Sequence, residues 1–232
     1  MRILVTGAAG QVGSTVARGL RDRHQVRGHD RLPMPELDDA VVSDLSDFDA
    51  LLEATRGVDA VAHIGGLPGD DGWEPIHRSN ILGTYNVFEA CRRNGVGRVA
   101  FASRIGVYGE FPRGVTLSVD LVPTPVGFYT ISKVFGESIA YSYSREHGMG
   151  CVCVRIGSFT LERDQPQSPL HLSHGDCVRV FERALVHPGV GFEVVFGVSD
   201  SNWPLYDLDH GRRVIGYHPQ DRSFVPEERW RK

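Results

Sequence analysis

The sequence contains few cysteines, no long apolar run and no excess of basic residues, and each absence excludes a class of protein. Its four cysteines form no C-x-x-C pair, so we predict that they are reduced and structural: Cys91, Cys151, Cys153 and Cys177. A formal net charge of -4 offers no basic surface for nucleic acid, and no apolar run approaches the length that spans a membrane. We therefore expect neither nucleic acid nor a membrane as a partner.

The size and composition are those of an ordinary globular protein. A chain of 232 residues with 41% hydrophobic and 23% charged residues fits one domain, or one domain with a small appendage. The first apolar run begins at residue 2, which leaves no place for the charged and apolar regions of a cleaved signal peptide. The cytoplasm is therefore the expected compartment.

The start of the chain combines a strand, a glycine turn and a helix. Residues 2–6 are apolar and rich in Ile, Leu and Val, and three glycines at intervals of three lead into helical spacing. Such a turn lets the backbone approach a pyrophosphate, which the amides at the helix start attract. The spacing differs by one residue from G-x-G-x-x-G, and a turn that binds nothing is the alternative. Its position favours a cofactor contacted by Gly7, Gly10, Gln11, Val12 and Gly13.

Two acidic residues follow the next two predicted strands. Asp30 ends the strand over 25–30, where a carboxylate accepts hydrogen bonds from the adenosine ribose and repels a 2′-phosphate. It favours NAD over NADP, although Arg31 could instead hold a 2′-phosphate. Asp44 follows the next strand and precedes Leu45; it either reaches the adenine or caps the helix over 47–55.

The next strand, over 58–64, leads to a glycine pair that can approach the second half of the cofactor, so Ile64, Gly65 and Gly66 are candidate cofactor contacts. His63 in this apolar run is interpreted as a core residue rather than a catalyst. A helix over 73–94 carries Asn80, which is either solvated or a bridge between the main chain and the active site.

A second helix, over 128–147, carries the residues with the clearest chemistry. Tyr129 and Lys133 are four apart and therefore share one helix face, where the ammonium would lower the pKa of the phenol and make it a proton acceptor or donor. The pair alone occurs often by chance. Ile131, Phe135 and Ile139 are predicted to mark the buried side of this helix.

Strand and helix alternate up to a strand over 151–156, which predicts an α/β fold: a Rossmann-like doubly wound parallel sheet. We predict that residues 1–156 bind NAD(P) and that residues 157–232 form a small substrate-binding segment of the same globule. His171, His174 and Asp176 lack the frame of a metal site, and Ser173 with Asp176 suits a helix start.

Taken in this order, the motifs resemble the extended short-chain dehydrogenase/reductase superfamily, which includes NAD-dependent epimerases and dehydratases, and within it the uronate dehydrogenases. The likeness covers nearly the whole chain. It implies that Tyr129 is the catalytic acid/base and that Lys133 binds the nicotinamide ribose. The motifs that carry it are residues 6–10, 63–66, 80–86, 132–137, 155–158, 173–176 and 197–199, and they add Asn80 and Ile156 to the cofactor contacts and Ser158 to the substrate contacts.

The sequence departs from this family at the substrate. The family's catalytic serine corresponds to Arg104, and Ser103 lies one residue earlier, so one of the two is expected to support the reacting oxygen and contact substrate. Ile105 and Gly106 replace an Asn and a His that contact uronate, and Pro68 replaces a serine. These departures argue against a uronate substrate.

The resulting hypothesis is an NAD-dependent oxidoreductase that transfers hydride between nicotinamide and a hydroxyl or carbonyl of a sugar-like small molecule. Two alternatives stay open: a sugar-nucleotide epimerase or dehydratase, and a cofactor-binding regulator without catalysis. NADP is the less favoured cofactor, no metal is expected, and a homo-oligomer is compatible with the sequence.

Overall fold

The computed structural model describes residues 1–69, 72–109, 115–161 and 167–229. Its centre is a seven-stranded parallel sheet with the strand order β3-β2-β1-β4-β5-β6-β7. The strands are β1 (Arg2–Thr6), β2 (Gln25–Asp30), β3 (Asp39–Val42), β4 (Ala60–His63), β5 (Arg98–Arg104), β6 (Gly150–Ile156) and β7 (Phe192–Gly197). This order confirms the predicted doubly wound fold, in which strands are added on one side of β1 up to β3 and on its other side from β4 onward.

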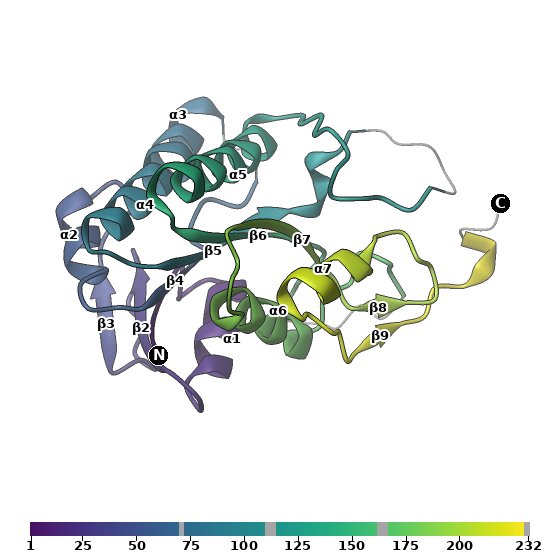
Figure 1. Ribbon diagram of the computed structural model, residues 1–232, viewed down its shortest axis with the longest axis horizontal. Coiled ribbons are helices and arrows are strands. Elements are labelled where there is room, and N and C mark those ends of the chain that lie inside the picture. Colours follow the sequence, from purple (N-terminus) through teal and green to yellow (C-terminus); the bar gives the residue numbers. More distant parts are fainter. Residues whose placement is uncertain (70–71, 110–114, 162–166, 230–232) are drawn as a thin grey trace.

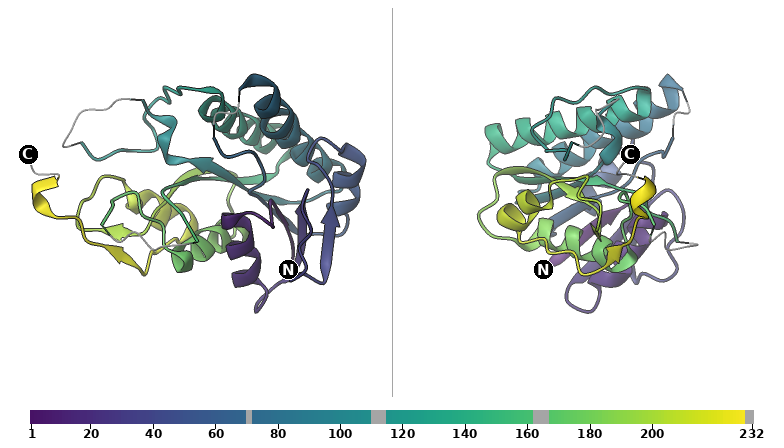
Figure 2. Two further views of the ribbon diagram at one scale, coloured as in Figure 1. Left: turned by 180° about the vertical axis from the view of Figure 1, so that it is seen from behind. Right: turned by 90° about the vertical axis from the view of Figure 1, so that its right-hand side faces the viewer.

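Helices cover both faces of the sheet (Figures 1 and 2). One layer contains α1 (Gln11–Leu20) and α6 (His174–Val186), with α7 (Leu208–Ile215) against β7. The opposite layer contains α2 (Phe48–Ala54), α3 (Trp73–Ile76), α4 (Gly83–Arg93) and α5 (Phe128–His147). Each layer encloses its own apolar core, and the central strands β1, β4, β5 and β6 between them are almost fully buried, whereas the edge strand β3 is partly exposed. Among the described residues, no helix is both long and apolar enough to cross a bilayer.

Two predicted elements differ from the sequence expectation. The single helix expected over 73–94 is divided, since a π-helical stretch, η1 (His77–Leu82), separates α3 from α4. The helix α5 buries a different side from the one predicted: Ile131 is 42% exposed, whereas Lys133 and Glu137 are buried. Polar residues face inward here because partners near the carboxyl ends of the strands satisfy them. Gly136 also lets Phe101 approach, since a Cβ there would lie 2.1 Å from the ring.

The C-terminal segment adds short elements beyond the alternating core. These are β8 (Asp200–Ser201), β9 (Arg222–Ser223) and the 3-10 turn η3 (Glu227–Arg229), with α7 between the two strands; a further 3-10 turn, η2 (Ile105–Val107), directly follows β5. The sequence analysis predicted none of these elements and not α7. The strands and 3-10 turns are too short to show a periodic pattern, and α7, although amphipathic, is a short helix of eight residues with Gly211 on its buried side.

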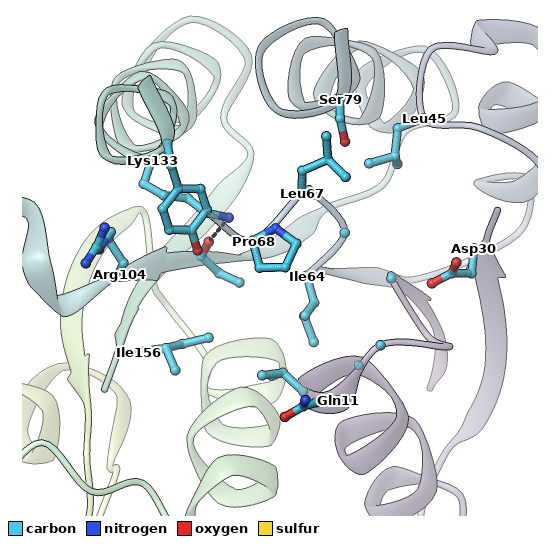
Figure 3. A pocket seen from close by; sticks show the side chains of 18 of the residues that line it. Gln11, Asp30, Leu45, Ile64, Leu67, Pro68, Ser79, Arg104, Lys133 and Ile156 are labelled. Carbon is cyan, nitrogen blue, oxygen red and sulfur yellow. Dashed lines mark hydrogen bonds between the residues drawn. The ribbon is translucent and has the colours of Figure 1, made fainter. Parts of the chain in front are cut away.

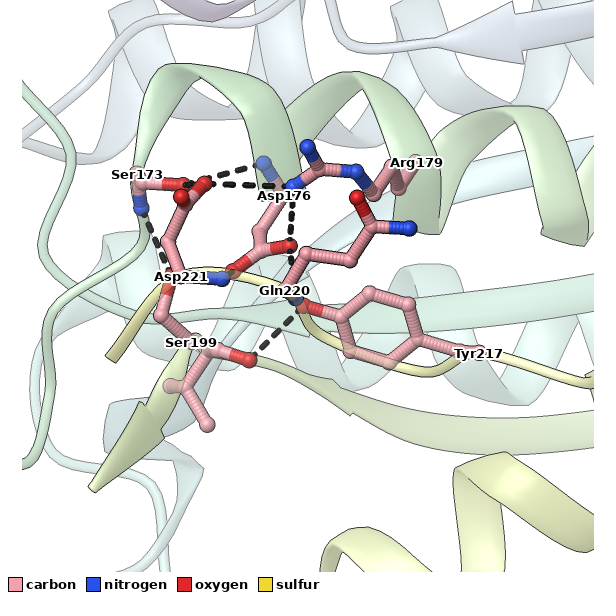
Figure 4. A network of polar contacts seen from close by, with 8 residues as sticks. Ser173, Asp176, Arg179, Ser199, Tyr217, Gln220 and Asp221 are labelled. Carbon is pink, nitrogen blue, oxygen red and sulfur yellow. Dashed lines mark hydrogen bonds and ion pairs between the residues drawn. The ribbon is translucent and has the colours of Figure 1, made fainter.

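A polar network ties this segment to α6 (Figure 4). Ser173 caps the helix by accepting a hydrogen bond from the amide of Asp176, which confirms the predicted helix start. The carboxylate of Asp176 is fully buried and accepts hydrogen bonds from the amides of Gln220 and Asp221 at 2.8 and 3.1 Å. The guanidinium of Arg179 lies 2.6 Å from it. The Asp176 carboxylate therefore holds residues 220–221 against the first turn of α6.

Candidate active site

A cavity of about 990 Å³ opens along the carboxyl ends of the strands (Figure 3). Its lining includes residues from the turn after β1, the ends of β2, β4, β5 and β6, and the start of α5. All the predicted site residues line it except Asn80: Gly7, Gly10, Gln11, Val12, Gly13, Asp30, Asp44, Leu45, Ile64, Gly65, Gly66, Ser103, Arg104, Tyr129, Lys133, Ile156 and Ser158. Residues far apart in the sequence are therefore brought to one surface.

The glycine turn between β1 and α1 leaves no room for side chains where the backbone is closest. Gly7 has a positive φ of 72°, and a Cβ there would lie 2.7 Å from the Cα of Gly65. A Cβ on Gly13 would lie 2.0 Å from the carbonyl oxygen of Gly7. Gly10 is the N-cap of α1 and has no side-chain cap. The amides at the start of α1 therefore face the cavity as donors suited to a pyrophosphate.

The acidic residues lie at the far end of the cavity from Tyr129. The carboxylate of Asp30 accepts hydrogen bonds from the amides of Ala9 and Leu32, each at 3.0 Å, which fix it at the end of β2 beside the glycine turn. Asp44 accepts hydrogen bonds from the hydroxyl and amide of Ser46, and these lower the pKa of its carboxyl. Asp47, rather than Asp44, caps α2. This end has the donor and acceptor groups that an adenosine requires.

Asn80 does not line the cavity but supports its wall from behind. Its side chain accepts from the amide of Leu67 at 2.8 Å and donates to the carbonyl of Leu67 and to Ser132. The structure therefore does not place Asn80 in the lining, where a direct contact with the cofactor would be expected. The alternative interpretation, a bridge from the main chain to the catalytic helix, describes its contacts.

Tyr129 and Lys133 lie together at the end of β5, as their spacing predicts. The Lys133 ammonium donates to the carbonyl of Ala102 at 2.9 Å and lies 5.6 Å from the centre of the Tyr129 ring. Burial, followed by the charge of Arg104, lowers the pKa of Lys133 to about 8. The expected lowering of the Tyr129 pKa does not hold: burial raises it, and Arg104 opposes that rise. Desolvation of the phenol outweighs the nearby charge.

Ser103 and Arg104 take different directions because successive strand residues point to opposite sides. The Ser103 hydroxyl is buried and donates to Glu137 at 2.6 Å, so its proton is already engaged by that carboxylate. The Arg104 guanidinium lies 5.3 Å from the centre of the Tyr129 ring and donates to the hydroxyl of Thr130 at 2.9 Å. Of the two candidates for supporting the reacting oxygen, Arg104 is the one beside the phenol.

The sequence analysis missed a buried ion pair behind Ser103. Glu137 on α5 and Arg155 on β6 form two hydrogen bonds of 2.8 Å, and Arg155 also donates to the phenol oxygen of Tyr108. These residues are far apart in sequence, and no motif joins them. The pair fixes α5 to β6 one turn after Lys133. Through Tyr108, it also connects α5 and β6 to the residues that follow β5.

His63 has the structural role that its apolar surroundings suggest. Its ring is fully buried between the hydroxyls of Thr6 and Thr84, at 2.8 and 3.1 Å. Burial, followed by the charges of Lys133 and His29, lowers its pKa to about 3. A neutral imidazole held by two hydroxyls is a core residue, as predicted.

Comparison with known proteins identifies the group to which this fold and site belong. Residues 3–180 match the model of the NAD dependent epimerase/dehydratase family. The chain belongs to this family. It is 36% identical over 230 residues to a uronate dehydrogenase of Pseudomonas syringae pv. tomato, covering 97% of this chain and 83% of that one. It is 33% identical over 254 residues to an L-arabinose 1-dehydrogenase (NAD(P)(+)) of Haloferax volcanii, covering 98% of this chain and 99% of that one.

The solved structures agree with these relatives. A uronate dehydrogenase mutant from Agrobacterium tumefaciens, complexed with NAD, superimposes with a TM-score of 0.88 at 33% identity, covering 96% of this chain and 85% of that one. The expectations of a Rossmann-like fold, of likeness to uronate dehydrogenases and of an NAD-dependent oxidoreductase of the short-chain dehydrogenase type are confirmed.

Proposed function

We propose that this protein transfers hydride between NAD and a secondary hydroxyl or carbonyl of a sugar-like compound, with Tyr129 as the acid/base. The observation that carries the proposal is one cavity that combines the uncapped start of α1 at one end with Tyr129 and Lys133 at the other. The Tyr129 hydroxyl has no hydrogen-bond partner among the described residues, so it is available to a substrate. The named relatives oxidise sugars or sugar acids, which supports this substrate class.

The residues of this chain fit the cofactor. The space in front of Gly10 is free of side chains, and the fixed carboxylate of Asp30 faces the position of an adenosine ribose. NAD, when bound, accepts or supplies the hydride. Gly7, Gly10 and Gly13 would cradle the pyrophosphate, Asp30 would favour NAD over NADP, and Lys133 would hold the nicotinamide ribose.

The proton moves through Tyr129. In carbonyl reduction the neutral phenol, which its raised pKa favours, donates a proton to the forming alkoxide. In oxidation the phenolate accepts the hydroxyl proton as hydride leaves carbon, and the positive charges of Lys133 and Arg104 stabilise that phenolate. Arg104 supports the oxygen in both directions in place of Ser103, and the Ser158 hydroxyl contacts the substrate.

The test is the formation of NADH from NAD over a panel of sugars and sugar acids. Replacement of Tyr129 by phenylalanine should lower kcat by about 10²- to 10⁴-fold and leave NAD affinity unchanged. The matched control is Tyr141→Phe on the same helix, whose side chain is half exposed and contacts the ring of Phe192 instead. Undiminished turnover in Tyr129→Phe would remove this mechanism. Tightly bound NAD with no net NADH would favour the epimerase hypothesis.

The other expectations accompany this proposal. We expect residues 1–156 to bind the cofactor and residues 157–232 to complete the substrate site. We also expect the protein to work in the cytoplasm, without nucleic acid, as a monomer or a homo-oligomer. Size-exclusion chromatography with light scattering measures the number of subunits.

A further inference from the structure

Contacts with neighbouring residues fix the side chain of Arg104 at the end of the cavity that contains Tyr129. Its guanidinium lies over the Tyr129 ring and donates one hydrogen bond to Thr130, which is buried. These two contacts fix the plane of the group and, among the residues that the structure describes, engage one of its five N–H donors with an acceptor. The remaining donors are available beside the phenol that moves the proton.

Gly106 provides the space for this guanidinium. A Cβ at residue 106 would lie 2.6 Å from Nη2 and 2.9 Å from Nε of Arg104, which is closer than such atoms can approach. Any larger residue would therefore displace the guanidinium from its position. Residues 104 and 106 therefore depend on each other: Arg104 carries the positive charge, and Gly106, which has no side chain, leaves space for its guanidinium.

The charge of Arg104 has no acidic partner among the described residues. Its side chain forms no ion pair there, and the neighbouring Lys133 donates to a carbonyl, not to a carboxylate. The acidic residues of the described lining, Asp30 and Asp44, follow β2 and β3 at the adenosine end. The lining also contains several apolar side chains: Leu67, Pro68, Ile105, Ile156, Phe159 and Leu170. Two positive charges in such surroundings favour an anionic ligand.

We propose, on the basis of the function proposed above, that the substrate is a 2-hydroxy acid or the corresponding 2-oxo acid, and that Arg104 binds its carboxylate. The planar fork of a guanidinium offers parallel donors to two neighbouring oxygen atoms. In a 2-hydroxy acid, the carboxylate and the reacting oxygen are on adjacent carbons, so one guanidinium can contact both. The hydroxyl proton passes to Tyr129, the hydride from the same carbon passes to NAD, and the products are the 2-oxo acid and NADH.

The experiment measures binding to the complex of the enzyme with NADH, followed by NADH fluorescence. The probe is oxamate, an unreactive analogue of a 2-oxo acid, and its neutral partner is oxamide, which has nearly the same shape. The wild-type protein should bind oxamate about 10- to 100-fold more tightly than oxamide. Arg104→Gln should abolish this preference, Arg104→Lys should retain part of it, and Gly106→Ala should weaken it by displacing the guanidinium.

The matched control is Arg78→Gln, which removes an arginine from the other end of the cavity, beside Asp44. It should leave the ratio of oxamate to oxamide affinity unchanged. Equal affinity for the two probes in the wild-type protein, or a preference that survives Arg104→Gln, would overturn the proposal. Failure of the proposed function gives a different result. NADH would then not bind to the protein, so its fluorescence would not change when the protein is added, with or without either probe.

Discussion

Replacing Lys133 by methionine should change how the stability of the protein depends on pH. The lysine is buried, and burial, followed by the charge of Arg104, lowers its pKa from 10.5 to about 8. Between these two pH values the unfolded chain binds a proton at Lys133 that the folded protein has released. The contribution of Lys133 therefore makes the folded state more stable as the pH rises through this window.

The size of the effect follows from the two pKa values. The difference between 10.5 and about 8 corresponds to about 3 kcal/mol of unfolding free energy, at about 1.4 kcal/mol for each pKa unit. Below pH 8 the folded protein bears this full cost of burying the charge. Lys133→Met removes it but leaves the carbonyl of Ala102 without its donor, a loss of about 1 kcal/mol. We expect the variant to be about 2 kcal/mol more stable at pH 7 and to lose turnover.

Urea unfolding at a series of pH values from 7 to 10 tests this prediction. The wild-type curve alone is insufficient, because burial also raises the pKa of buried thiols such as Cys151, which lowers stability as the pH rises. These thiols are common to both proteins, so the difference between wild type and Lys133→Met isolates the lysine. That difference should shrink and then change sign above pH 8. A difference that does not vary with pH would refute the reasoning.

Three further predictions test the cofactor cradle and the C-terminal network. Gly13→Ala should lower the free energy of unfolding by about 1–3 kcal/mol, since its Cβ would meet the carbonyl of Gly7. Gly10→Ala should instead keep the free energy of unfolding within about 1 kcal/mol of the wild type but lose NAD affinity, as measured by calorimetry. An equal loss of stability in the two variants would contradict this division. Asp30→Ala should lower the ratio of kcat/KM for NAD over NADP at least about tenfold, and an unchanged ratio would show that the carboxylate does not select the cofactor. Asp176→Ala should lower the free energy of unfolding by about 2–4 kcal/mol in urea, because two amides lose their acceptor and a guanidinium its partner; a loss below about 1 kcal/mol would disprove the role of the network.

The parts of the site that the sequence predicted are those that depend on short spacings. The glycines of the first turn, the carboxylate that ends β2 and the Tyr129/Lys133 pair each lie within one element or one turn. Backbone geometry alone then brings them to the carboxyl edge of the sheet. The order of strands follows in the same way, since apolar runs alternate with helical spacing up to residue 156.

The parts that the sequence did not predict depend on tertiary contacts. The buried side of α5 was wrong because apolar periodicity identifies the inward face only where the core is apolar, and here Lys133 and Glu137 face inward. The raised pKa of Tyr129 was missed for a related reason: spacing gives the neighbouring charge but not the degree of burial. The Glu137 and Arg155 pair joins two elements that no local pattern connects.

The hydrogen bond of Ser103 separates its role from that of the next residue, Arg104. Both side chains contact α5, Ser103 through Glu137 and Arg104 through Thr130, but only Arg104 is shown over the Tyr129 ring among the described residues. The Ser103 hydroxyl donates to Glu137, and turning it toward the phenol would remove a donor from a buried carboxylate whose other partner is Arg155. With Ser103 engaged in this way, Arg104 is the residue that we propose to contact the substrate, and the tests of Arg104→Gln and Arg104→Lys address that proposal.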